Sequence, residues 1–287
     1  MHVDPTAPAA SPAPAVAPPP TEGRARSPLR HVADALSAAN AVCGGVSIVC
    51  AAYGRVDVSL LLLLVGAVFD GLDGAAARRF GGTRFGVLAD DIADAVSYAV
   101  APGVAIAHVV DGVAGTVVGV AFVVLTVTRL VYFTLRKGQP GDEPRHFRGM
   151  PSTVGGIVAL AAAILFAAQP ALVAFLAGMA VVLMVSFDAG FLHLGRAAGS
   201  MAPATRRAAG GAVVVVTGVA IALGPQVLAT AALLCALTYA FGPHAQAFAD
   251  AVVARARRAE EPVRAVRTSS RTATSALSRR PQVDVGA

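Results

Sequence analysis

The sequence predicts an all-α polytopic membrane protein, a helical bundle of about eight transmembrane helices. Of its 287 residues, 56% are hydrophobic and only 14% are charged, whereas about 25% of the residues in an ordinary soluble domain are charged. Apolar runs of about 18 or more residues, long enough to cross a bilayer, recur along the chain. Because the hydrocarbon core offers backbone groups no water to bind, these runs are expected to be helical.

The predicted helices follow one another through short connections, with no soluble domain inserted. They cover residues 33–53, 57–79, 86–107, 112–135, 152–168, 171–192, 207–223 and 225–242. Residues 1–30 are rich in Pro and Ala and contain no apolar signal segment, which predicts a disordered cytosolic arm. The basic residues 247–287 predict a largely disordered cytosolic tail. Between them lie a predicted transmembrane core, 31–195, and additional transmembrane helices, 196–246.

The distribution of positive charge predicts the orientation in the membrane. Arginines gather in alternate loops, which contain Arg78, Arg79, Arg84, the segment 136–148, Arg196, Arg206 and Arg207. The positive-inside rule places these loops, and with them both termini, in the cytosol of a cell-membrane protein. The net charge of +6 lies in loops and tails rather than on a folded basic face. We therefore expect membrane lipids, and no nucleic acid, as its partners.

Four carboxylates interrupt the apolar pattern in "DGLDGAAARRFGGTRFGVLADDIAD", residues 70–94. At about 100° per residue, Asp70 and Asp73 share one face of the second span, and Asp90 and Asp94 share one face of the third. The short connection makes the two helices antiparallel neighbours, so that their acidic faces can meet. A charge at the bilayer centre costs about 2.5–3.5 kcal/mol, so a counter-charge is needed. Converging carboxylates fit Mg²⁺ or Mn²⁺, and two such ions could bridge a diphosphate.

Small and basic residues beside the acids fit the same substrate. Gly74 and Ala77 leave room for a ligand or a second helix. Arg78 could reach a phosphate from the helix end, and Thr83 offers a hydroxyl. Intramembrane carboxylates also serve cation transporters. A cation path, however, has no need of the Gly74-x-x-Ala77-Arg78 pattern.

The acidic stretch resembles the signature of the CDP-alcohol phosphatidyltransferase family. The matching pattern is Asp70-x-x-Asp73-Gly74-x-x-Ala77-Arg78, followed by Gly86-x-x-x-Asp90-x-x-x-Asp94. Seven residues separate Arg78 from Gly86, one fewer than is usual in the family. The segments "LSAANAVCGGVSI" (36–48), "DAVSYAVAPG" (94–103), "TRLVYF" (128–133) and "HFRGMPSTVGG" (146–156) resemble the phosphatidylserine synthase branch. The likeness covers roughly residues 30–165.

The resemblance implies a six-helix family core with two helices added. It also implies transfer of a phosphatidyl group from CDP-diacylglycerol to an alcohol, with release of CMP. L-serine is the favoured acceptor, and glycerol phosphate and inositol phosphate are the alternatives. Asp70, Asp73 and Asp90 would hold the metal ions, while Asp94 would share in ligation and act as the catalytic base. The substrate-binding residues it implies are Gly74, Ala77, Arg78, Thr83, Gly86, Asn40 and Ser37. A homodimer is typical of the family.

Some polar residues allow two interpretations from the sequence. Asn40 and Ser37 could approach the nucleotide or could join helices by hydrogen bonds, and the two are equally supported. Arg129 and Arg148 could meet an acceptor carboxylate, although topology anchors are the favoured interpretation. Asp91 points about 100° away from Asp90 and is expected to face solvent.

Overall fold

The computed structural model describes residues 28–83, 85–136, 146–187, 190–192 and 202–242. The predicted arm, apart from its last three residues, and the predicted tail lie outside these residues. The main helices are α1 (His31–Ala52), α2 (Val56–Phe80), α3 (Gly86–Asp94), α4 (Ala101–Val110), α5 (Gly112–Arg136), α6 (Ser152–Leu165), α7 (Pro170–Val185) and α9 (Pro203–Leu223). A further helix covers Pro225–Gly242.

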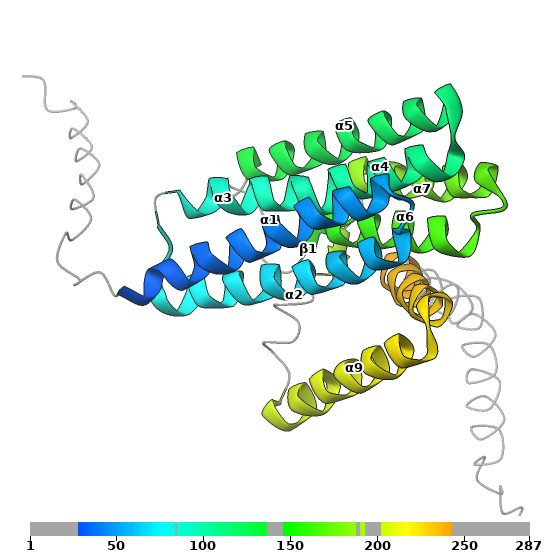
Figure 1. The fold of residues 1–287 in the computed structure, drawn as a ribbon. Coiled ribbons are helices and arrows are strands. Elements are labelled where there is room, and N and C mark those ends of the chain that lie inside the picture. The colour runs from blue at the N-terminus through cyan, green and yellow to red at the C-terminus, as the bar shows by residue number, and fades with distance from the viewer. Residues whose placement is uncertain (1–27, 84, 137–145, 188–189, 193–201, 243–287) are drawn as a thin grey trace, which may run out of the picture.

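Helices α1 to α7 form a bundle with roughly aligned axes (Figure 1). Helix α1 packs along α2 and also contacts α3 and α4, while α5 packs on α4 and α7. The largest fully buried side chains include Tyr98, Phe122, Leu60, Leu63 and Ile106. On α5 the exposed side chains Val113, Val117, Val120 and Val124 recur every three or four residues. Such an outward apolar stripe is suited to lipid contact, not to water.

The predicted fold class is confirmed. Within the described residues, six helices are long and apolar enough to cross a membrane: α1, α2, Gly86–Val110, α5, α9 and Pro225–Gly242. Helices α6 and α7 are apolar but shorter, with 14 and 16 residues, or about 21 and 24 Å at 1.5 Å per residue. The predicted spans 152–168 and 171–192 were therefore too long.

The end of the predicted span 171–192 was wrong in kind as well as in length. Helix α7 stops at Val185, and Gly190–Leu192 forms strand β2. This strand pairs antiparallel with β1 (His146–Arg148), with Phe147 opposite Phe191. At the end of α7 the Ser186 hydroxyl donates to the Val182 carbonyl at 2.6 Å. Such a local bond competes with continuation of the helix.

The third span contains a π-helical turn at Ala95–Val100, between α3 and α4. Pro102 lies in the first turn of α4. Proline has no N–H for the regular helical bond and its ring crowds the preceding turn. The wider turn accommodates both effects and keeps Gly86–Val110 continuous. It also rotates the residues directly after Asp94 relative to a regular α-helix.

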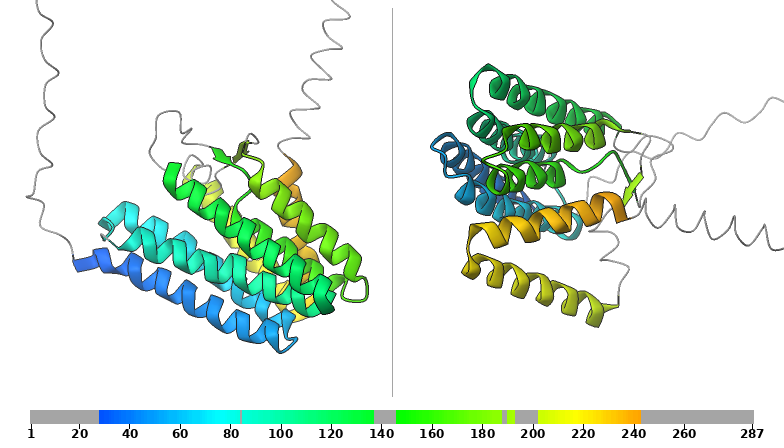
Figure 2. Two further views of the ribbon diagram at one scale, coloured as in Figure 1. Left: turned by 90° about the horizontal axis from the view of Figure 1, so that it is seen from above. Right: turned by 90° about the vertical axis from the view of Figure 1, so that its right-hand side faces the viewer.

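The last two helices lie to one side of the bundle. Helix α9 stands apart, and Pro225–Gly242 runs back between α9 and the bundle (Figure 2). The exposed side chains of α9 include Val213, Val214, Val215 and Val216. In contrast, Leu228, Leu233 and Ala236 of the last helix are buried. The last helix, more than α9, is thus part of the packed structure.

Candidate active site

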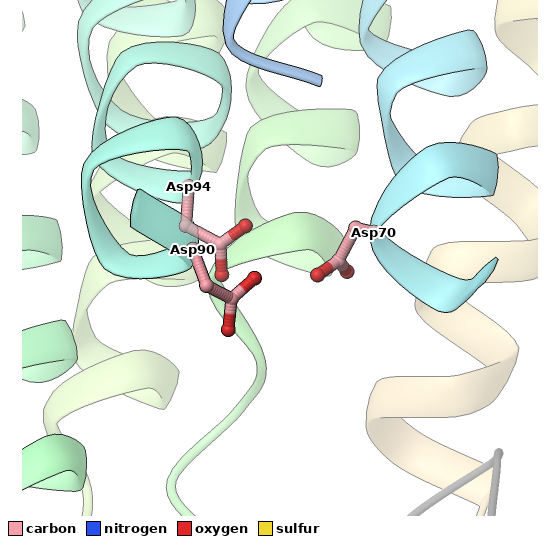
Figure 3. Close-up of side chains that lie close together, drawn as sticks. All are labelled: Asp70, Asp90 and Asp94. Atoms are coloured by element: carbon pink, nitrogen blue, oxygen red, sulfur yellow. The ribbon is translucent and has the colours of Figure 1, made fainter. Parts of the chain in front are cut away.

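Three carboxylates from two helices converge at one point. Asp70 comes from α2, whereas Asp90 and Asp94 lie one turn apart on α3 and point toward it (Figure 3). One oxygen from each of the three lies within 4.8 Å of the others, and all three residues are half-buried. The predicted meeting of the two acidic faces is confirmed for these three residues.

The turn between α2 and α3 brings them together. Gly81 ends α2 with φ +86° and ψ 153°, a conformation that residues with a Cβ rarely adopt. The Thr83 hydroxyl then donates to Asp34 Oδ1 of α1 at 2.9 Å, and the Gly81 N–H bonds back to the Ala77 carbonyl at 3.0 Å. Glycine and this tether thus hold the short loop, and Thr83 faces α1.

Asp73 lies outside the group of three. It is 5% exposed, and its Oδ2 accepts a hydrogen bond from the Ser37 hydroxyl at 2.7 Å. The same hydroxyl lies 3.2 Å from the Ala33 carbonyl. Ser37 therefore joins α1 to α2 at the acidic site. Asp73 remains close enough to Asp70 for electrostatic repulsion.

Asn40 connects α1 to Asp94. Its side chain is fully buried, and its Nδ2 lies 3.4 Å from Asp94 Oδ1. Its Oδ1 accepts from the Ser97 hydroxyl at 2.8 Å, and this bond fixes which end of the amide faces Asp94. The π-helical turn carries Ser97. Ser97 was not predicted as a site residue, although its position three residues after Asp94 indicates a shared helix face.

The remaining motif residues line the end of α2 and the start of α3. Gly74 and Ala77 are half-buried, and Arg78 is exposed. A Cβ built on Gly74 would lie 3.3 Å from the Arg78 guanidinium, so Arg78 extends back over Gly74. A Cβ on Gly86 would lie 3.0 Å from Asp34 Oδ1, so this glycine permits close approach of α1.

Asp91 was expected to face solvent, and this was wrong. It is half-buried, and the Thr134 hydroxyl of α5 lies 2.9 Å from both of its carboxylate oxygens. The rotation of about 100° from Asp90 does turn Asp91 away from the group of three. A neighbouring helix, which helical periodicity alone does not reveal, lies on that side.

Arg129 lies inside the bundle on α5. It is 4% exposed, and its Nη1 donates to the Ser152 hydroxyl at 3.4 Å. It is among the charged groups acting on Asp94. A topology anchor at the lipid–water boundary would be exposed, so the favoured sequence interpretation was wrong for Arg129. The side chain of Arg148 lies outside the described residues.

The chemistry of the acidic group fits a divalent cation. Two carboxylates about 4–5 Å apart repel each other by about 3–4 kcal/mol at an effective dielectric constant of 20. Three of them in one half-buried place require positive charge. Carboxylate oxygens from rigid helices are hard ligands, of the kind that Mg²⁺ and Mn²⁺ prefer. Asp70, Asp90 and Asp94 can therefore hold a metal ion.

The fold and the site define a polytopic membrane protein with an acidic centre between two helices that could hold a cation. The family model of the CDP-alcohol phosphatidyltransferases matches residues 30–187, which is more than half of the chain. The chain belongs to this family, and the resemblance inferred from the motif is confirmed.

Two curated relatives share the core. Archaetidylserine synthase of Methanothermobacter thermautotrophicus is 32% identical over 129 residues, covering 43% of this chain and 54% of that protein. CDP-diacylglycerol–serine O-phosphatidyltransferase of Mycobacterium leprae is 34% identical over 123 residues, covering 40% of this chain and 41% of that protein. The matches thus span about half of the relatives' own length.

Proposed function

We propose that this protein transfers a phosphatidyl group from CDP-diacylglycerol to L-serine and releases CMP. The observation that carries the proposal is the convergence of Asp70, Asp90 and Asp94 in a chain of the CDP-alcohol phosphatidyltransferase family. Serine is favoured over glycerol phosphate or inositol phosphate because both relatives are named as serine-using enzymes.

Asp70, Asp73, Asp90 and Asp94 would hold the cations, which we propose to be two ions of Mg²⁺ or Mn²⁺. Such ions would supply positive charge for the diphosphate and for the negative charge that develops on departing CMP. Asp73 would join through the carboxylate oxygen that Ser37 does not occupy. Gly74 and Ala77 would leave space for the cytidine nucleotide, with Arg78, Thr83 and Gly86 nearby. In this mechanism Asn40 and Ser37 support the acidic residues that they contact.

Asp94 would accept the proton of the acceptor hydroxyl. The oxygen then attacks the phosphorus next to diacylglycerol and forms the new P–O bond. The P–O bond to CMP breaks, and CMP leaves with its electron pair. Most of the acceleration in such a reaction comes from position and charge neutralisation. The hydrogen bond from Asn40 keeps one Asp94 oxygen in a defined direction.

The site would face the cytosol, because the arginines of the loop between α2 and α3 favour that side. Both termini would lie on the same side, and the protein would act within the cell membrane as a homodimer. These orientations can be tested by labelling single cysteines introduced in the loops of intact cells.

The activity is tested with the purified protein, CDP-diacylglycerol and Mg²⁺ or Mn²⁺. We expect serine-dependent CMP release, and we expect Asp94→Asn to lower its rate at least about 100-fold, since general bases contribute at least that factor. Asp91→Asn is the matched control, because Asp91 faces Thr134 instead, and it should retain activity. No CMP release with any alcohol would overturn the proposal. Release only with another alcohol would overturn the choice of serine.

A further inference from the structure

Arg129 is a buried charge that the proposed chemistry does not yet use. Among the described residues it is the one buried cation. It lies seven residues before the end of α5 at Arg136, or about 10 Å along the helix axis. Its guanidinium carbon lies 5.4 Å from the centre of the Phe133 ring. An ionisable side chain at such a depth in a membrane protein is costly and usually has a function.

The surroundings of Arg129 carry a second positive feature. Its Nη1 donates to the hydroxyl of Ser152, the first residue of α6. The N–H groups of the first helical turn carry partial positive charge, so a cation is disfavoured at this end. Asp94 is a negative group that acts on Arg129. Asp94 also belongs to the acidic group of three, where a bound cation would compete for its charge. The carboxylate of an acceptor bound beside Arg129 would add negative charge next to the guanidinium when a cation draws on Asp94.

The last helix reaches the same place. Tyr239 of Pro225–Gly242 interacts electrostatically with Arg129. Its ring also stacks on Phe191, with ring centres 6.3 Å apart. Phe191 is fully buried in β2, whose partner β1 is followed closely by Ser152. Tyr239 and Phe191 both lie beyond the family match, which ends at residue 187.

We propose that Arg129 binds the carboxylate of an amino-acid acceptor and that Tyr239 positions Arg129 for this contact. The last helix would thereby complete the acceptor site of the family core. The inference rests on the proposed function. The planar guanidinium can bind a carboxylate through two parallel N–H···O bonds, and a carboxylate is the anionic group that an amino-acid acceptor offers. The hydroxyl and carboxylate of serine are separated by only two carbon atoms. Asp94 and Arg129 act on each other electrostatically, so in this proposal one serine presents its hydroxyl to Asp94 and its carboxylate to Arg129.

The test compares L-serine with L-serinamide, which keeps the hydroxyl and the amine but has a neutral amide. We expect the wild-type protein to prefer L-serine. Arg129→Gln should raise the KM for L-serine about 10- to 100-fold, the loss expected for a charge-assisted hydrogen bond. Its KM for L-serinamide should change little. Arg136→Gln, on the same helix but at an exposed position, is the matched control and should leave both KM values unchanged.

Tyr239→Phe should raise the KM for L-serine by a smaller factor without lowering kcat in proportion. Tyr132→Phe is its control, because Tyr132 also stacks on a phenylalanine, Phe187, with centres 3.8 Å apart. As a readout independent of turnover, L-serine should raise the melting temperature of the metal-loaded wild-type protein but not that of Arg129→Gln. Arg129→Lys keeps the charge and should give an intermediate KM if Arg129→Gln does not fold.

The possible failures separate the two proposals. If the wild-type protein releases no CMP with any acceptor, the proposed function fails. If it uses L-serine but the substitutions at Arg129 change the KM for L-serine and for L-serinamide by the same factor, Arg129 only offsets the charge of Asp94. That result, or an unchanged KM for L-serine, overturns the inference. If Tyr239→Phe has the same kinetics as Tyr132→Phe, the role of the last helix is overturned.

Discussion

Adding one methyl group at Gly44, one turn after Asn40 on the same face of α1, should disturb the active site. A Cβ built there would lie 2.9 Å from both Cα and N of Ser97, and still closer to the Ser97 hydroxyl oxygen. Ordinary carbon contacts are about 3.5–4.0 Å, so Gly44→Ala must separate α1 from the π-helical turn by roughly 0.5–1 Å. The clash involves backbone atoms, which cannot rotate away.

This separation has two consequences. Overpacking of this kind costs about 1–3 kcal/mol of stability. It also stretches the bond from the Ser97 hydroxyl to Asn40 Oδ1, now 2.8 Å, and with it the contact between Asn40 and Asp94. A displacement near 1 Å in a catalytic group can lower the rate by about 100-fold. We therefore expect Gly44→Ala to lower the rate of CMP release even under conditions in which the protein remains folded.

The adjacent Gly45 is the matched control. A Cβ at Gly45 has no neighbour within 4 Å, and alanine in a helix is favoured over glycine by about 0.5–1 kcal/mol. Gly45→Ala should therefore unfold at the same or a higher SDS concentration, as followed by circular dichroism, and should release CMP at the wild-type rate. Equal stability and equal activity of the two variants would refute the close packing of α1 on the π-helical turn.

Three further results are expected. Asn40→Ala should weaken Mn²⁺ binding, measured by electron paramagnetic resonance, because Asp94 loses the bond that orients it. Ser47→Ala, which removes another buried polar group of α1, should leave Mn²⁺ affinity unchanged. Equal affinities of the two variants would contradict this role of Asn40. Thr134→Val should lower the free energy of unfolding by about 1 kcal/mol, since the carboxylate of Asp91 loses its partner on α5. An unchanged midpoint of unfolding in SDS would argue against that contact. Chelation of divalent ions by EDTA should abolish CMP release, and readdition of Mg²⁺ or Mn²⁺ should restore it, whereas activity that persists in EDTA would contradict the metal-bound mechanism.

The helical fold could be predicted because its causes are local. In hydrocarbon, each backbone group must find its partner within its own helix, so composition and run length suffice to locate α1, α2 and α5. The same reasoning failed after Val185. There the chain pairs Gly190–Leu192 with His146–Arg148, and about 40 residues of sequence separate the two strands. A pairing of this kind leaves no periodic signal.

The acidic site could be predicted in part. The spacing of Asp70, Asp73, Asp90 and Asp94 indicated two acidic faces on adjacent helices, because helical geometry relates residues three or four apart. The spacing did not show that Asp73 turns to Ser37 while the other three converge. That division depends on where α1 packs.

The sequence by itself determined the membrane-spanning helices, the family signature and the two helices that carry the carboxylates. Tertiary structure decided the partners: Asn40 and Ser97 beside Asp94, Thr134 beside Asp91, and Arg129 enclosed by α6 and the last helix. The physical reason is that helical periodicity fixes the direction of a side chain around its own axis only. The group that it meets depends on how the helices pack against one another.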